Sequence, residues 1–113
     1  MTPEDINRFF EARAPKFIPA EAAVGYILHA LLQRDTYGTE LSQQLTKQHP
    51  HLNVSDAVLY KALQFLERKQ FIGRYKKELE GRGRPRQMFR LAPAVRTQAQ
   101  ELAQLWEQFV TYQ

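Results

Sequence analysis

Cysteine is absent from this chain of 113 residues, and histidine occurs only three times. Without cysteine, neither a disulfide framework nor a thiolate metal site can form. His29 stands among apolar residues, which favours packing over catalysis, and His49 and His51 have no carboxylate at ligand spacing. The sequence therefore predicts no metal and no cofactor, and the absence of cysteine agrees with a reducing compartment.

Long apolar runs are also missing. No stretch approaches the roughly 18 apolar residues of a membrane-spanning helix, and the acidic opening "MTPEDINRFF" lacks the apolar core of a signal peptide. There is no Walker loop, and the glycines of "GRGRPR" (81–86) do not have the spacing of a dinucleotide-binding fingerprint. We therefore expect a cytoplasmic protein that is not an enzyme.

Positive charge is present in excess and is unevenly distributed. The net charge is +4, yet residues 61–90 contain ten Lys or Arg against three Asp or Glu, a local charge of +7. The six basic and nine acidic residues elsewhere give −3. A basic patch on a chain that is 43% hydrophobic, and so able to bury a core, predicts a folded domain with a polyanionic partner.

The first third of the chain predicts two helices separated by a break. Residues 2–13 begin with Thr-Pro-Glu-Asp, a helix-start signature, and place Ile6, Phe9 and Phe10 on one side. The two prolines of "APKFIP" (14–19) indicate a break. Apolar residues then recur at three- and four-residue intervals from 20 to 33, which predicts a second helix.

Two further helices are expected in the middle of the chain. Gly38 is available for a positive φ at the end of "RDTYG", and Thr39 is the expected cap of a third helix. After the loop "HPHLN", Ser55 is the expected N-cap of a fourth helix that runs to about Lys69.

The last third predicts a β-hairpin followed by a helix. The stretches "FIGRYKKE" and "QMFRLA" contain β-formers, and "LEGRGRPR" between them supplies turn residues for a long basic tip. After Pro93 the chain is expected to be helical, with a coiled-coil-like apolar stripe at Val95, Ala99, Leu102, Trp106 and Phe109.

This order of elements is that of a winged helix-turn-helix, a mainly α (α+β) fold with a two-stranded wing. We expect an N-terminal helix and connector at 1–19, a winged helix DNA-binding domain at 20–93, and a C-terminal dimerisation helix at 94–113.

The fourth helix has two distinct faces. An apolar stripe formed by Leu59, Ala62, Leu63 and Leu66 must face the core. The opposite face has small, aromatic, cationic and amide groups that read base edges and hold phosphates in a major groove: Ser55, Ala57, Tyr60, Lys61, Gln64 and Arg68. The alternatives are an ordinary solvated face and, for Tyr60, packing against the hairpin.

The hairpin tip has the composition of a minor-groove reader. Gly83 lacks a Cβ and allows deep entry, arginines suit the negative potential of narrow A·T-rich grooves, and Pro85 limits the entropy lost on ordering. The predicted wing contacts are Arg74, Lys76, Lys77, Arg82, Gly83, Arg84 and Arg86. The alternative is a mobile loop that touches nothing specific.

These motifs, in this order, resemble the PadR family of transcriptional regulators over residues 20–93. The resemblance rests on Tyr37-Gly38, Leu59-Tyr60, Leu63, Leu66-Glu67, Phe71-Ile72, Gly83-Arg84-Pro85 and Phe89 to Leu91. Two departures are Gln70, where the family often has glycine, and "LAPAVR", where "LTxxG" is usual. A narrower resemblance, to a clock-modifying member of the family, rests on the N-terminal helix and the one short C-terminal helix.

The resemblance implies a dimeric, nucleoid-associated DNA-binding regulator, most often a repressor. A single module of this size makes few contacts, so we expect a homodimer on a near-palindromic double-stranded site. The predicted dimerisation residues are Phe9, Phe10, Leu102, Leu105, Trp106 and Phe109. The alternative for the last helix is packing against its own domain.

Two other functions remain open at this point. The first is a protein-interaction adaptor whose basic hairpin meets an acidic partner. The second is a ligand-sensing regulator, although no polar cluster in the sequence indicates a small-molecule effector.

Overall fold

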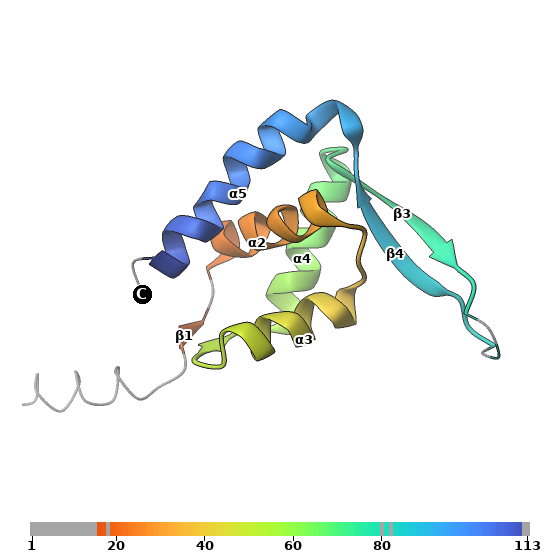
Figure 1. Ribbon diagram of the computed structural model, residues 1–113, viewed down its shortest axis with the longest axis horizontal. Coiled ribbons are helices and arrows are strands. Elements are labelled where there is room, and N and C mark those ends of the chain that lie inside the picture. Colours follow the sequence, from red (N-terminus) through yellow and green to blue (C-terminus); the bar gives the residue numbers. More distant parts are fainter. Residues whose placement is uncertain (1–15, 18, 80, 82, 112–113) are drawn as a thin grey trace, which may run out of the picture.

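The computed structural model describes residues 16–17, 19–79, 81 and 83–111. Within these ranges the elements follow in the order β1 (Lys16–Phe17), α2 (Ala20–Gln33), α3 (Gly38–Gln48), β2 (Leu52–Asn53), α4 (Asp56–Arg68), β3 (Ile72–Lys77), β4 (Arg86–Leu91), a 3-10 turn (Pro93–Val95) and α5 (Arg96–Thr111). Figure 1 shows α2, α3 and α4 together, the extended hairpin of β3 and β4, and α5 beside α2, which confirms the winged-helix fold class. The helix expected at 2–13, with Phe9 and Phe10, and also Arg82 lie outside the described residues.

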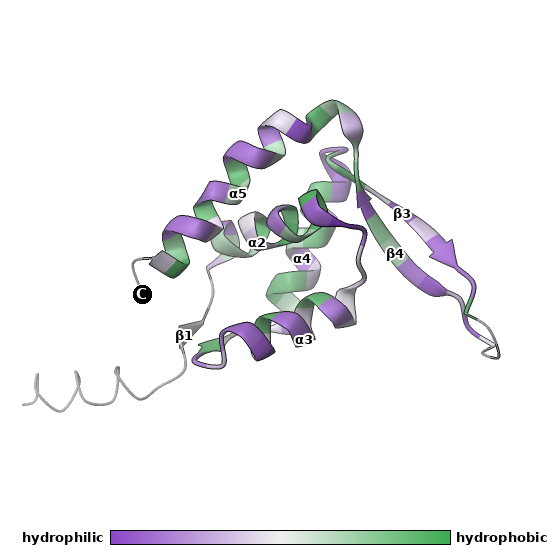
Figure 2. Ribbon diagram, in the orientation of Figure 1, coloured by the Kyte–Doolittle hydropathy of each residue, from purple (hydrophilic) through white to green (hydrophobic). Residues whose placement is uncertain are grey.

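The core forms around α2, which packs between α4 and α5 (Figure 1). Hydrophobic positions gather where these three helices meet, whereas α3 and β3 show mainly hydrophilic colour (Figure 2). The largest fully buried side chains come from α2, α3 and α4 and are Ile27, Leu28, Leu41, Leu45 and Leu66. The sequence periodicity placed α2 correctly at 20–33 and α4 to within one residue at each end.

The start of α3 corrects two expectations. The helix begins at Gly38, and Tyr37 holds the N-cap position, because its carbonyl accepts the first helical hydrogen bond from the Leu41 amide at 3.0 Å. Thr39 is therefore inside the helix and is not its cap. Gly38 does not have a positive φ, because α2 ends in extended backbone at Arg34 and needs no left-handed residue there.

A pair of short strands lies in segments for which the sequence predicted only a break and a loop. β1 pairs in parallel with β2, with Lys16 opposite Leu52 and Phe17 opposite Asn53. Two-residue strands contain no alternation, so sequence periodicity gives no sign of them. The pairing fixes the entry to α2 beside the entry to α4.

Tyr26 joins three helices inside the core. Its hydroxyl donates a hydrogen bond of 2.6 Å to the Leu41 carbonyl, and its ring meets Trp106 edge-on with 5.0 Å between centroids. Burial, with a smaller contribution from Glu40, raises the pKa of the Tyr26 hydroxyl to about 12. The hydroxyl therefore stays protonated and keeps its role as donor well above neutral pH.

Gln70 ends α4 in a left-handed conformation, with a φ of 62°. Its amide donates to the Glu67 carbonyl at 3.0 Å, and the Phe71 amide donates to the Leu66 carbonyl at 2.9 Å. This pair of bonds is a Schellman motif, whose left-handed position usually holds glycine. Gln70 therefore replaces the family's usual glycine at a position whose left-handed backbone favours glycine.

Gln70→Gly is expected to raise the free energy of unfolding by about 1 kcal/mol, because glycine adopts this φ without the clash of a Cβ. The measurement is urea unfolding of both proteins. Lys69→Gly, one residue earlier at a φ of −84°, is the control and is expected to lower stability by roughly 0.5–1 kcal/mol. If Gln70→Gly and the parent have the same free energy of unfolding, the backbone at residue 70 is not strained.

Candidate nucleic-acid interface

The exposed face of α4 carries the side chains that the sequence predicted for it. Leu59, Ala62, Leu63 and Leu66 are buried, and Ala57, Tyr60, Lys61, Gln64 and Arg68 are all exposed. Tyr60 is 54% exposed and lines a hollow together with Arg74 and Arg86 of the hairpin. Ser55 holds the N-cap position and is half-buried. The helix therefore presents one continuous polar face to solvent.

An open groove of about 650 Å³ lies between α3 and the first half of α4. A second hollow of about 580 Å³ continues it beneath the wing, reaching Arg86 and Gln87 on β4. Both hollows are lined by Thr39 and Gln43 of α3 together with Tyr60 of α4. Thr39 and Gln43 were not among the predicted site residues, since α3 carried no excess of charge to single them out.

The wing is a regular antiparallel ribbon in which Ile72 pairs with Leu91 and Lys77 with Arg86. Lys76, Lys77 and Arg84 are exposed, and so is Gly83, around which a Cβ would meet no atom within 4 Å. The positive φ of the tip is at Gly81, at 71°. Because β3 ends at Lys77 and β4 begins at Arg86, these basic residues belong to the end of the ribbon that Figure 1 shows away from the helices.

Arg86 is held against the helical body. Its guanidinium carbon lies 4.0 Å from the centroid of the Tyr37 ring, at the entry to α3. A guanidinium stacked on an aromatic face loses less freedom when it binds a further partner. The stacking directs this cation into the hollow between the wing and α3.

Arg74, one of the predicted wing contacts, is paired with a carboxylate of its own chain. Its Nε and Nη2 atoms donate to the two carboxylate oxygens of Glu67, each at 2.6 Å, and its guanidinium carbon lies 5.2 Å from the Phe89 ring centroid. The hydrogen bond to Glu67 raises the pKa of Arg74. Because both oxygens of Glu67 are engaged, Arg74 ties β3 to α4 and its charge is compensated within the protein.

Arg74→Ala and Glu67→Gln are expected to weaken duplex binding to a similar degree, and the double variant to be no worse than either. Each substitution releases the same link between the wing and α4, at a cost in stability of less than about 1 kcal/mol for a partly exposed pair. The measurement is a double-mutant cycle of binding affinity. If Arg74→Ala weakens binding and Glu67→Gln does not, Arg74 contacts DNA directly.

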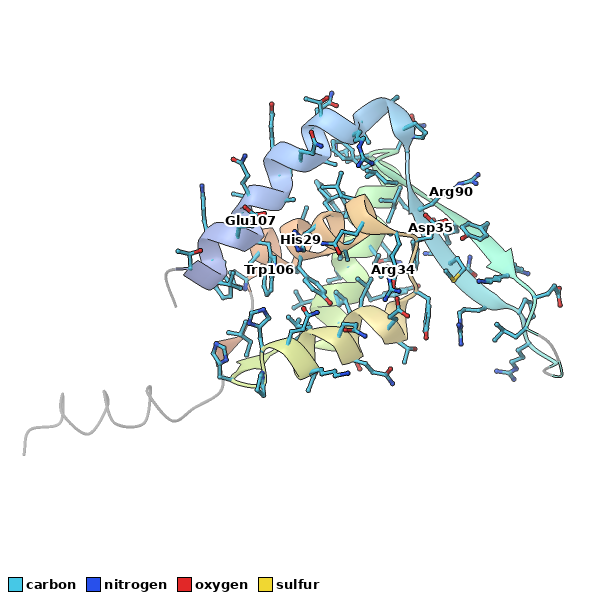
Figure 3. The ribbon with its side chains drawn as sticks, viewed as in Figure 1. His29, Arg34, Asp35, Arg90, Trp106 and Glu107 are labelled. Carbon is cyan, nitrogen blue, oxygen red and sulfur yellow. The ribbon has the colours of Figure 1, made fainter. Side chains whose placement is uncertain are left out.

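The base of the wing is fixed to the loop between α2 and α3. Thr36 and Phe89 exchange two backbone hydrogen bonds, of 3.2 and 2.7 Å. The Tyr75 hydroxyl donates to Asp35 at 2.7 Å, and Arg90 lies over the Tyr75 ring with 5.4 Å to the centroid. Figure 3 shows Asp35 and Arg90 together at this base. The ribbon therefore leaves the body in a defined direction.

The C-terminal helix corrects one predicted dimer contact. Trp106 is only 4% exposed and packs on Tyr26 of its own chain, and Ala99 and Ala103 are also buried. The alternative that this helix packs against its own domain therefore holds for its inner face. Leu102, Phe109 and Val110 are half-buried and pack against the core, and Leu105 is 38% exposed.

The histidines are placed as packing residues and surface residues. His29 of α2 lies beside Glu107 of α5 (Figure 3), with 3.9 Å between His29 Nδ1 and Glu107 Oε1. The His49 ring meets Trp106 edge-on, with 5.4 Å between centroids. Within the described ranges, no three His, Asp or Glu side chains lie close enough together to hold a metal ion. None of the described helices is both long and apolar enough to cross a bilayer.

Comparisons with known proteins agree with this geometry. Residues 27–101 match the transcriptional regulator PadR-like family. The crystal structure of the circadian clock associated protein Pex from Anabaena is 48% identical, with a TM-score of 0.84 over 99% of this chain and 97% of that one. Pex from Synechococcus sp. is 49% identical, with a TM-score of 0.82 over 97% and 98% of the two chains.

A solved structure of lower sequence identity has a similar fold over most of the chain. A PadR-like transcriptional regulator from Bacillus cereus is 26% identical, with a TM-score of 0.61 over 79% of this chain and 84% of its own. The narrower resemblance seen in the sequence is thus to Pex, whose similarity extends over almost the whole of both chains.

Proposed function

Since this chain belongs to the PadR-like family of transcriptional regulators, we propose that it represses transcription by binding a near-palindromic double-stranded DNA site as a homodimer. This proposal rests on one observation: α4 and the wing lie next to each other on the surface. Tyr60 of α4 and Arg86 of the wing line the same hollow, which continues the groove that Ala57 and Tyr60 line between α3 and α4. Its place of action is then the nucleoid of the cytoplasm.

In the proposed complex, α4 enters the major groove. A helix with its side chains is about 10–12 Å across, which matches a groove about 12 Å wide. Gln64 is then placed to bond adenine edges in a bidentate manner, and Lys61 and Arg68 to hold guanine or phosphate. Thr39 and Gln43 line the adjacent hollow and add contacts from α3.

The wing supplies a second, different contact. Arg84 at the free end of the ribbon enters an A·T-rich minor groove, where a narrow width concentrates negative potential. Lys76, Lys77 and Arg86 neutralise the flanking phosphates. Affinity and A·T preference come from the wing, and finer base selection comes from α4.

Dimerisation completes the proposed site. Residues 20–93 supply the DNA-binding domain, and residues 94–113 supply a dimerisation helix through Leu102, Leu105 and Phe109, with Trp106 reassigned to the core. A two-fold dimer places its recognition helices about 34 Å apart, one turn of the double helix.

Salt dependence tests the DNA-binding proposal. Because about six phosphate contacts release their counterions, the log–log plot of affinity against salt is expected to have a slope of about −5. The measurement is a titration of a labelled A·T-rich duplex across several salt concentrations. A slope near zero, with retention of an acidic protein instead, would support the protein-interaction adaptor.

The similarity to Pex supports a second, narrower proposal, that the regulated genes belong to a circadian clock. Identity of 48–49% over almost the whole of both chains favours a shared cellular role. Deletion of the gene in its host is then expected to change the period or phase of a luminescent rhythm reporter. An unchanged rhythm would contradict this proposal and leave DNA binding intact.

A further inference from the structure

The hollow beneath the wing differs in charge from the groove beside it. Arg74 and Arg86 line this hollow of about 580 Å³, and none of the described residues that line it is acidic. The groove of about 650 Å³ between α3 and α4 has Asp56 in its lining and no cationic residue among the described ones. The hollow beneath the wing therefore favours a phosphate group, and the groove between the helices favours uncharged base edges.

Arg86 supplies the positive charge that this hollow can offer to a partner. The Arg74 guanidinium is engaged by both carboxylate oxygens of Glu67, at 2.6 Å each. None of the ion pairs among the described residues includes Arg86. Its guanidinium carbon instead lies 4.0 Å from the centroid of the Tyr37 ring. A contact with a ring face leaves the N–H groups of the guanidinium available to phosphate oxygens.

We propose that the hollow beneath the wing binds the sugar–phosphate strand that separates a major groove from the next minor groove, and that Tyr37 positions Arg86 to bind one of its phosphates. The inference rests on the DNA binding of the proposed function. In that function α4 lies in the major groove and the wing in the adjacent minor groove. One backbone strand always runs between two such grooves, so a protein that enters both must leave room for it.

The place and the size of the hollow fit this strand. Its lining joins Tyr60 of α4 to Arg86 and Gln87 of β4, so it lies between the two elements that enter the grooves. Its volume of about 580 Å³ is in the range of pockets that hold drug-sized ligands, roughly 300–1,000 Å³, so the sugar and phosphate of one nucleotide fit.

Hydroxyl and amide side chains surround the hollow on its other sides. They are exposed and come from three elements: Thr39, Gln43, Tyr60 and Gln87. Threonine, glutamine and tyrosine are common hydrogen-bond donors to phosphate oxygens, and such contacts fix the position of a protein on the duplex without selecting a base. The hollow therefore sets the register of α4 and the wing on the DNA.

Tyr37 is held in place between α3 and the wing. It is the N-cap residue of α3, and its carbonyl accepts a hydrogen bond of 3.0 Å from the Leu41 amide. Thr36, next to it in the chain, exchanges two backbone hydrogen bonds with Phe89 of β4, the strand that also contains Arg86. Because the Tyr37 ring restricts the guanidinium before DNA binds, Arg86 loses less conformational freedom in the complex.

A double-mutant cycle of affinity for a labelled A·T-rich duplex tests the proposal. Arg86→Ala is expected to lower affinity roughly tenfold, because a charge-assisted phosphate contact is lost. Tyr37→Leu is expected to lower affinity roughly threefold in the parent and to cause no further loss in the Arg86→Ala background. Tyr37→Phe keeps the aromatic ring and is expected to bind within about twofold of the parent.

Arg90→Ala is the matched control for Arg86→Ala. Arg90 is also an arginine of β4 that lies over a tyrosine ring, with 5.4 Å to the Tyr75 centroid, but it does not line the hollow. Its removal is expected to change affinity less than about threefold. An equal loss from Arg86→Ala and Arg90→Ala would overturn the proposal. An equal loss from Tyr37→Leu with and without Arg86 would also overturn it, because a purely structural role of Tyr37 has that result.

Replacement of single phosphates by neutral methylphosphonates locates the contact on the DNA. In a duplex enriched from a random pool, the parent is expected to lose roughly tenfold in affinity when the phosphate held by Arg86 is replaced, and Arg86→Ala is expected to lose nothing at that position. If both proteins lose equally at every position, Arg86 holds no particular phosphate, and the proposal fails while DNA binding stands. If the parent binds no duplex, the proposed function fails, and this proposal fails with it.

Discussion

Arg84→Ala is expected to lower affinity for a duplex with A·T-rich flanks by about 100-fold. Each guanidinium that hydrogen-bonds on the floor of a minor groove contributes roughly 1.5 kcal/mol, about tenfold in affinity, and a dimer loses two of them. Arg84 is exposed at the free end of the wing, so its removal leaves the core intact. The measurement is a titration of the same duplex with both proteins at fixed salt.

Two matched variants separate groove recognition from simple loss of charge. Arg96→Ala removes an equal charge from the exposed start of α5 and is expected to change affinity less than threefold. Gln64→Ala on α4 is expected to relax base preference in the major groove while keeping the A·T preference of the flanks. Equal losses of affinity from all three variants on every duplex would contradict separate roles for the wing, in A·T preference, and for α4, in base selection.

Gly25→Ala is expected to lower the free energy of unfolding by about 2–3 kcal/mol. A Cβ on Gly25 would lie 2.8 Å from the backbone nitrogen of Trp106 and 3.0 Å from the carbonyl oxygen of Leu102. Backbone atoms cannot rotate away as side chains do, so α5 as a whole must shift from α2. Urea unfolding measures the loss, and a melting temperature lower by roughly 10 °C is expected to accompany it.

Gly38→Ala is the matched control for this substitution. Gly38 is also in a helix, and a Cβ there would meet no atom within 4 Å. Its stability is expected to equal or exceed that of the parent, because alanine is the better helix former. If Gly25→Ala is as stable as Gly38→Ala, α2 and α5 are not as close at Gly25 as the structure shows.

Local signals in the sequence were sufficient for most of the fold. Apolar residues at three- and four-residue spacing placed α2 and α4, because each helix buries one stripe against the core. Turn residues between two runs of β-formers placed the hairpin, since the tip residues cannot continue either strand. The exposed face of α4 followed from the same periodicity.

The features that sequence reasoning missed depend on contacts between distant segments. Gly25 has no local reason to be glycine, and its role appears only when α5 lies against it. Trp106 falls on an apolar stripe that serves either a partner or the chain's own core, and periodicity does not distinguish the two. Arg74 was assigned to DNA from its charge, whereas Glu67 lies close enough to engage it only after α4 and β3 have packed.

Selection of bound duplexes from a random pool tests the central proposal most directly, because the enriched sequence reports on both the recognition helix and the dimer. Two inverted half-sites are predicted, with centres about 10–10.5 base pairs apart and A·T-rich steps at the positions of the wings. Enrichment of no sequence, or of a single half-site without its inverted partner, would contradict sequence-specific binding by a two-fold dimer.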